Sequence, residues 1–508
     1  MRRPARVLAV LPLIFASMLL AHYPFLRLPY FWDEAGYYIP AALDFCRHGW
    51  LIPRDTLPSG HTPLVMIYLG GLWRLFGFSQ VVTRGAMILV AAATAVITYV
   101  LGRRVAGREV GIWSAILLAL SPLFFAQSSL VFLDLTVACF TGLSVLFLLE
   151  ERWRLFALSA VLAVMSKETA AVMLPVMWSF AFFRRKERRT IAWIALTAPA
   201  AALAGWAVYY HHFTGFWTGN AQYLQYNLYS ALTVAHVLRS LVARIAEIFI
   251  QGFNWLLTAG AVIGFVWARR PRRAITDKAA EPKDPIPQSR RFRVDFMILS
   301  VALGAGYVLM LSLVGGAVLA RYVLPVMPLF MVFCVALIAR LPPHTAHAWF
   351  LAAAACFVAC WFINPPYPFP YENNLSYVDF IRLHQAAARY LESLPGNPVI
   401  LTAWPATDEL RQPFLGYVKR PLRVAQTDDF TSANFRNLPP FDVLYLYSRK
   451  WEPRYNLLTR IRLLRQVAAR FYGYSPPVSA RDLRTPFHLK LLKQMERRGQ
   501  WVRIYARQ

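Results

Sequence analysis

Long apolar runs recur along most of this chain, separated by short polar stretches. Several of them, such as 81–101 and 246–268, reach the roughly 20 residues that an α-helix needs to cross a lipid bilayer. Hydrophobic residues make up 57% of the 508 residues and charged residues only 16%, which is too apolar for a soluble protein of this size. The pattern predicts an α-helical polytopic membrane protein.

About eleven transmembrane helices are expected. The first apolar run, 7–25, follows three arginines, and we expect it to be a retained anchor rather than a cleaved signal peptide, because no small-residue cleavage site follows it. A short run at 63–76 predicts an interfacial helix instead of a span. The other expected spans are 81–101, 110–126, 133–149, 155–165, 169–183, 191–209, 246–268, 296–314, 323–338 and 348–363.

Basic clusters predict the orientation of these spans. Positive charge accumulates on the cytoplasmic side of membrane proteins. The clusters at 103–104, 152–154, 184–189, 269–273 and 290–291 all fall on the same side as the N-terminus. We therefore expect a cytoplasmic N-terminus in the cell inner membrane, a first outer loop at 26–80 and a cytoplasmic loop at 269–294.

The apolar spans end near residue 363, and the remaining chain predicts a soluble domain. We expect a transmembrane domain at 1–364 and a soluble α/β domain at 365–508, joined by a proline-rich linker and lying on the outer, periplasmic face. The hydrophobic pattern predicts helices at 377–394, 454–469 and 487–498, and strands at 398–404, 441–447 and 501–506.

The charge and the cysteines narrow the partners. The formal net charge of +28 lies mostly in short clusters between apolar runs, so it fits orientation and anionic lipid contact rather than nucleic-acid binding. The five cysteines show neither a disulfide framework nor zinc-ligand spacing. No metal-ligand set is predicted, and a divalent cation as cofactor stays open.

The first outer loop carries two adjacent carboxylates. Asp33 and Glu34 directly follow the first hydrophobic segment, so they are expected at the membrane surface, where a carboxylate stays hydrated yet can reach a lipid-anchored substrate. Asp33 could instead cap a surface helix, with Glu34 in its first turn. Because neighbouring helical positions point roughly 100° apart, the two carboxylates cannot do the same job.

Further polar residues fall in loops on the same outer face. These are His61, Asp134, Lys167, Glu168, Arg321 and Tyr322. Asp134 could cap its span, and Lys167 with Glu168 could form a turn whose lysine reaches for water. Arg321 contradicts the inside preference for positive charge, which a phosphate partner would explain; the alternative is again a side chain reaching for water. The aromatic-rich stretch 209–229 suits stacking on sugars or lipid, although an interfacial aromatic belt is the commoner explanation.

These motifs in this order resemble the membrane glycosyltransferases that use polyprenyl-phosphate sugars, which have the GT-C fold and include protein O-mannosyltransferases and lipid A aminoarabinose transferases. The resemblance rests on Asp33-Glu34, on His61-Thr62-Pro63-Leu64, on Asp134 at a span end, and on the Arg-Tyr-x-x-Pro-x-x-Pro segment that begins at Arg321. Thr62 stands where the family has a first proline. The resemblance covers about the first 340–365 residues.

The resemblance implies an inverting glycosyltransferase at the outer face of the inner membrane. Transfer from a polyprenyl phosphate needs a base for the acceptor but no acid for the phosphate. Asp33 would be that base and Glu34 would orient the sugar or acceptor. Arg321, helped by Tyr322 and His61, would hold the phosphate. Asp134, Lys167 and Glu168 are further candidate substrate contacts, and the acceptor would be a lipid, glycan or protein.

Two other functions compete with this one. A transporter or flippase of lipid-linked sugars also needs many spans, but its charges should lie near the bilayer midplane in repeated broken helices, and the sequence contains no visible repeat. A catalytically inactive scaffold with the same fold is the other alternative.

Overall fold

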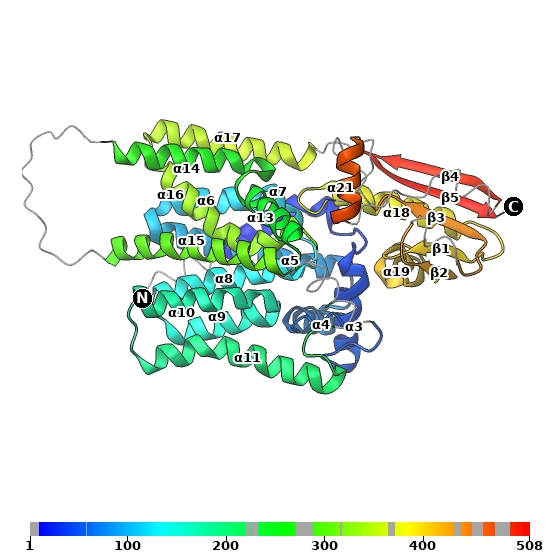
Figure 1. The fold of residues 1–508 in the computed structure, drawn as a ribbon, viewed down its shortest axis with the longest axis horizontal. Coiled ribbons are helices and arrows are strands. Elements are labelled where there is room, and N and C mark those ends of the chain that lie inside the picture. The colour runs from blue at the N-terminus through cyan, green and yellow to red at the C-terminus, as the bar shows by residue number, and fades with distance from the viewer. Residues whose placement is uncertain are drawn as a thin grey trace, which may run out of the picture.

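A computed structural model of the chain describes residues 10–56, 58–219, 224, 232–270, 288–314, 317–363, 371–430, 438–449, 461–472 and 488–507. Figure 1 shows long helices running side by side and, at one end of this bundle, a smaller unit of helices and strands. The chain is thus mostly helical with a small C-terminal sheet, as the sequence predicts. The linker expected at 365–368 and most of the loop expected at 269–294 lie outside the described residues.

Residues 10–362 form the bundle and its connections. The elements are α2 (Val10–Ala21), η1 (Tyr23–Phe25), η2 (Glu34–Tyr38), α3 (Ile39–His48), α4 (Leu64–Phe76), α5 (Gln80–Ala106), α6 (Arg108–Leu120), α7 (Pro122–Gln127), α8 (Leu133–Leu149), α9 (Trp153–Ser166), η3 (Glu168–Val172), α10 (Met173–Ser179), η4 (Phe180–Arg184), α11 (Thr190–Thr214), α13 (Val234–Phe249), η6 (Gln251–Phe253), α14 (Asn254–Arg269), α15 (Gln288–Leu313), η7 (Ala320–Val326), α16 (Met327–Ile338) and α17 (Pro343–Phe362).

Within the described ranges, five helical segments are long and apolar enough to cross a membrane: α5, α11, α15, η7 with α16, and α17. The bent pair formed by α13 and α14 would make a sixth. The shorter helices α2, α4, α8 and α9 are also apolar. The count of eleven spans therefore stays a prediction.

Two runs that the sequence predicts as single helices are broken. The run 246–268 belongs to α13 and α14, which meet at a 40° bend where Gly252 and Phe253 take positive φ angles of 60° and 66°. A glycine adopts such a conformation without steric cost, so Gly252 permits the break. The run 110–126 is divided at Ser121, because the residue before a proline disfavours the helical conformation and Pro122 starts a new helix.

The C-terminal unit contains a five-stranded mixed sheet. Its elements are α18 (Ser376–Glu392), β1 (Ile400–Ala403), α19 (Ala406–Arg411), η8 (Pro413–Leu415), β2 (Val424–Thr427), β3 (Val443–Tyr447), α21 (Arg462–Tyr472), β4 (Leu489–Arg497) and β5 (Gln500–Arg507). The strand order is β2-β1-β3-β5-β4. β1 pairs in parallel with β2 and β3, with Ile400 opposite both Val424 and Val443, and β5 runs antiparallel to β3 and β4.

The helix predicted at 487–498, of which residue 487 lies outside the described part of the chain, is wrong, because Leu489–Arg497 form β4. Its spacing of leucine and methionine imitates a helix, but Arg498 and Gly499 both take positive φ angles, 47° and 85°. Two such residues in a row make the tight turn that joins hairpin strands, so β4 folds back onto β5. The other expected elements are present at 377–394, 398–404, 441–447 and 501–506. Of the helix predicted at 454–469, residues 454–460 lie outside the described part, and α21 covers the rest.

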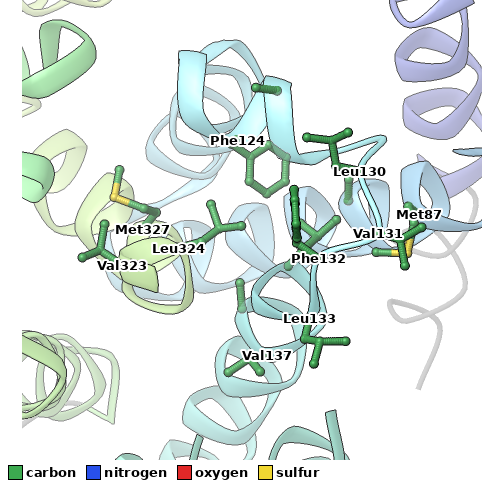
Figure 2. Close-up of a cluster of buried hydrophobic side chains, with 14 of the residues drawn as sticks. Met87, Phe124, Leu130, Val131, Phe132, Leu133, Val137, Val323, Leu324 and Met327 are labelled. Carbon is green, nitrogen blue, oxygen red and sulfur yellow. The ribbon is translucent and has the colours of Figure 1, made fainter. Parts of the chain in front are cut away.

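A compact apolar cluster fixes the segments that carry Asp134 and Arg321. Figure 2 shows Phe132, the residue before α8, near Phe124 of α7 and Leu324 of η7, with Leu133 of α8 and Met327 of α16 in the same cluster. Each of these five side chains is at most 2% exposed. Side chains packed this closely can adopt few other arrangements, so this cluster holds α7, α8 and η7 in a defined arrangement.

Candidate active site

Asp33 lies where the extended segment after η1 turns into η2. It is the residue before η2, but its side chain makes no capping hydrogen bond, so the capping alternative does not account for it. Instead its carboxylate accepts a hydrogen bond from Nη2 of Arg321, which is 288 residues away in sequence. The two residues were predicted to lie on one face, and the fold places them in contact.

Arg321 is the centre of a buried ion cluster. Its side chain is only 2% exposed, so it does not reach for water. Besides Asp33, the guanidinium donates to Glu372 through Nη1, and its Nε lies 3.7 Å from Oδ2 of Asp134. The guanidinium carbon lies 4.0 Å from the centre of the Phe132 ring, so the Arg321 side chain packs against the apolar cluster described above.

Asp134 and Lys167 complete this cluster. Asp134 lies in the first turn of α8, and its Oδ1 accepts a hydrogen bond from Nζ of Lys167 at 2.8 Å. Lys167 stands between α9 and η3, is 6% exposed, and lies 4.3 Å from the centre of the Tyr322 ring. Both side chains are therefore partners in a buried network, which neither a helix cap nor a solvent-seeking lysine would require.

His61 and Glu168 form a second pair beside the first. Nδ1 of His61 lies 2.9 Å from Oε2 of Glu168. The Tyr38 ring lies 6.0 Å from the His61 ring and 6.3 Å from the Phe132 ring, so it stands between this pair and the Arg321 cluster. The loop that carries His61 packs closely against the backbone at Gly219, because a Cβ on Gly60 would lie 2.1 Å from the backbone nitrogen of Gly219.

Glu34 points away from the cluster and is fully buried. One of its oxygens accepts from the Phe31 backbone N–H at 2.7 Å and from Nη2 of Arg84 at 3.0 Å. The other accepts from Arg84 Nη1 and from the Val131 backbone N–H. A carboxylate with four donors has little capacity left for a substrate. Breaking such a buried ion pair costs about 3–5 kcal/mol, so Glu34 anchors the first loop to α5.

Sequence reasoning missed Arg84 and Glu372. Arg84 stands near the start of the apolar run 81–101, and a charge inside such a run indicates a buried partner of opposite sign. Glu372 follows the last apolar run, within what the sequence marks only as the beginning of a soluble tail. In the fold it is 8% exposed, and its backbone carbonyl accepts a hydrogen bond from Gln127 of α7 at 2.9 Å.

The charges of the cluster do not balance. Arg321 and Lys167 carry two positive charges, whereas Asp33, Asp134 and Glu372 can carry three negative ones. Burial raises the pKa of the Glu372 carboxyl, the Arg321 guanidinium opposes this shift, and the nearby Asp33 and Asp134 carboxylates add to it, so that the pKa is raised to about 7. Glu372 is therefore the member of the cluster that takes up a proton near neutral pH.

Accessibility separates the three carboxylates. The Asp33 side chain is 20% exposed, against 4% for Asp134 and 8% for Glu372. Asp33 is thus the carboxylate that an incoming molecule reaches first. Within the described ranges, no group of three or more His, Cys, Asp or Glu side chains is arranged to hold a metal ion.

Comparisons with known proteins agree with this architecture. Residues 60–212 match the family described as dolichyl-phosphate-mannose-protein mannosyltransferase. No curated protein matches the chain at a significant level. Crystal structures of ArnT from Cupriavidus metallidurans, bound to undecaprenyl phosphate and in the apo state, share the fold with a TM-score of 0.54 and 12% identity, over 98% of this chain and 97% of that one.

A third solved structure is less similar. The oligosaccharyltransferase of Archaeoglobus fulgidus in its apo form has a TM-score of 0.44 and 11% identity, over 83% of this chain and 64% of that one. Residues 60–212 thus resemble that mannosyltransferase family, and the chain as a whole shares the fold of ArnT.

Proposed function

We propose that this protein transfers a sugar from a polyprenyl-phosphate donor to an acceptor at the outer face of the inner membrane, with inversion at the sugar carbon. The observation that carries this proposal is the meeting of Asp33 and Arg321. One guanidinium contacts the most accessible carboxylate of the cluster and retains an Nε that makes no hydrogen bond to any described residue. A phosphate oxygen is a suitable acceptor for that N–H.

In the proposed reaction, Asp33 takes the proton from the acceptor hydroxyl or amine as that atom attacks the anomeric carbon. The bond between this carbon and the phosphate oxygen breaks, and its electron pair leaves on the polyprenyl phosphate. Arg321 and Lys167 stabilise the departing negative charge. Asp134 aligns both cations, and the pair His61–Glu168 with Tyr322 borders the sugar. Glu34 keeps the first loop in place rather than touching the substrate.

The donor chemistry is tested with purified full-length protein in proteoliposomes. We expect release of undecaprenyl phosphate from an undecaprenyl-phosphate sugar when an outer-leaflet extract supplies the acceptor, together with a glycosylated product of inverted configuration. Movement of the donor across the bilayer without any product would favour a transporter instead.

We further propose that residues 1–364 form the membrane domain and residues 365–508 a periplasmic domain. A topology reporter fused after residue 369, in cells that express the protein, tests this placement.

The Glu372 carboxyl should make donor binding depend on pH. Its pKa is raised to about 7, so above pH 7 it is charged and competes with the phosphate for Arg321, whereas below pH 7 it is protonated and releases the guanidinium. We expect the affinity for undecaprenyl phosphate to fall roughly fivefold more between pH 6 and pH 8 in the wild type than in Glu372→Gln.

Undecaprenyl phosphate itself titrates in this pH range. This affects the wild type and Glu372→Gln equally, so it cancels when their affinities are compared. Isothermal titration across this pH range gives the two dissociation constants. Parallel pH profiles for the wild type and Glu372→Gln would show that Glu372 does not compete for Arg321. The groups that face Glu372 are Arg321 of η7, Asp33 of the first loop and Asp134 of α8.

A further inference from the structure

Three aromatic side chains lie together near Asp33, where the first loop contacts the C-terminal unit. Trp404 follows β1, and its ring lies 5.5 Å from the ring of Trp32 and 5.9 Å from that of Tyr37. All three side chains are only partly buried. We call Trp32, Tyr37 and Trp404 the aromatic wall.

The backbone is shaped to bring these rings together. Gly36 has no Cβ, and a Cβ built there would lie 2.6 Å from Nε1 of Trp404. The indole therefore lies directly on the η2 backbone, one turn from Asp33. Trp32 has a positive φ of 51°, which is unusual for so bulky a residue. Strained conformations of this kind concentrate at functional sites.

Two carboxylates border the aromatic wall. Asp33 follows Trp32 in the chain, and Asp408, in the first turn of α19, lies near the Trp404 side chain. Both carboxylates act electrostatically on the Tyr37 hydroxyl and raise its pKa beyond the effect of burial, so both lie near that ring. Burial also raises the pKa of Asp408 to about 6.

We propose that the aromatic wall with Asp408 is the acceptor subsite and that it takes a carbohydrate. Partly exposed aromatic faces beside a few fixed polar groups are typical of small-molecule sites. Indole and phenol rings offer flat apolar surfaces to the C–H face of a sugar ring, while carboxylates accept hydrogen bonds from its hydroxyls. An interfacial belt would turn these rings toward lipid, whereas these rings pack against one another and against the backbone at Gly36 while each stays partly exposed.

The inference rests on the proposed function, because it makes the partner of Asp33 a sugar hydroxyl. Its test is nevertheless independent of catalysis. Full-length protein in lipid nanodiscs, free of glycosidic detergent, is titrated with maltotriose, with chitotriose and with a peptide rich in serine and threonine, and binding is followed by saturation-transfer NMR and calorimetry. Undecaprenyl phosphate is titrated separately as the measure of donor binding.

We expect the wild type to bind at least one trisaccharide, and Trp404→Ala to weaken that binding about tenfold or more. Trp404→Phe should lose less, because it keeps a stacking surface. Gly36→Ala, whose methyl group would displace the indole, should resemble Trp404→Ala and guards against an effect of the truncation on folding. Trp217→Ala is the matched control. This tryptophan belongs to the aromatic-rich stretch 209–229, is 61% exposed and stacks on His211.

Three results would overturn the inference: no trisaccharide binds the wild type, Trp404→Ala and Gly36→Ala bind as the wild type does, or Trp217→Ala alone abolishes binding. Binding of the peptide in place of the sugars would assign the surface to a protein acceptor. If the wild type did not bind undecaprenyl phosphate, the proposed donor would be wrong. The trisaccharide titration would still show whether the aromatic wall binds sugar.

Discussion

Asp33→Asn should lower the turnover of sugar transfer by about 10²-fold or more while donor binding stays close to that of the wild type. A general base typically contributes 10²–10⁴-fold to a rate, and an amide cannot take the acceptor proton. Asparagine keeps the shape of the side chain and can still accept one hydrogen bond from Arg321. The measurement is the steady-state rate with saturating undecaprenyl-phosphate sugar, together with a separate titration of undecaprenyl phosphate.

Asp55→Asn provides the control for this experiment. Asp55 is an exposed carboxylate in the same first loop, and it does not take part in the Arg321 cluster. We expect its substitution to leave the rate unchanged. If Asp33→Asn transferred sugar as fast as the wild type, the proton would have to leave through another group, and Asp134 and Glu372 are too enclosed to be its first substitutes.

The members of the Arg321 cluster other than Glu372 could be predicted from sequence, because most of them break a local rule. Asp134 is an acid at the start of the apolar run 133–149, Lys167 stands between two apolar runs, and Arg321 is a positive charge on the face that the basic clusters predict to lack it. Orientation from the basic clusters then places all of them on the same face. What the sequence could not supply is which charge meets which, since partners separated by up to 288 residues are chosen by packing.

Glu34 illustrates this limit. Its position next to Asp33 suggests a shared role, but its carboxylate turns toward Arg84, which lies 50 residues later on α5. Glu372 illustrates the opposite case, because nothing local distinguishes it from other acids of the C-terminal unit. In the fold, Gln127 of α7 donates a hydrogen bond to the Glu372 backbone carbonyl, and the Glu372 side chain accepts a hydrogen bond from Arg321.

The errors in secondary structure have the same cause. The pattern of β4 satisfies a helix as well as a strand, and a hairpin partner that comes later in the chain decides between them. The bend between α13 and α14 depends on Gly252, a single residue that a smooth hydropathy profile does not register. In each case a local φ angle or a distant strand overrides the periodicity.

The second large effect is expected at Arg321. Arg321→Lys should raise the KM for the undecaprenyl-phosphate sugar about tenfold and leave the KM for the acceptor nearly unchanged, and Arg321→Ala should raise the donor KM further, toward a hundredfold. A hydrogen bond to a charged group contributes about 1.5–3 kcal/mol, which corresponds to these factors. Lysine keeps the charge but not the planar fork that binds two oxygens at once.

Folding and catalysis must be separated in this case, because Arg321→Ala leaves Asp33 and Glu372 without their common partner. Removing one member of a buried ion pair costs about 3–5 kcal/mol, so thermal unfolding of each variant is measured alongside the kinetics. The double variant Arg321→Ala with Glu372→Gln removes one unpaired charge and should recover stability without recovering donor affinity. That combination distinguishes an arginine that binds phosphate from one that only neutralises its neighbours.

The matched control is Arg74→Lys. Arg74 is an arginine of α4 that donates to the backbone carbonyls of Phe45 and Cys46, both at 2.8 Å, and lies apart from the cluster. Its substitution should leave the donor KM as it is, because it makes the same change of side chain without touching the site. A wild-type donor KM in Arg321→Lys and Arg321→Ala would mean that the guanidinium serves only to neutralise three buried carboxylates, and the phosphate would then have to be held by Lys167.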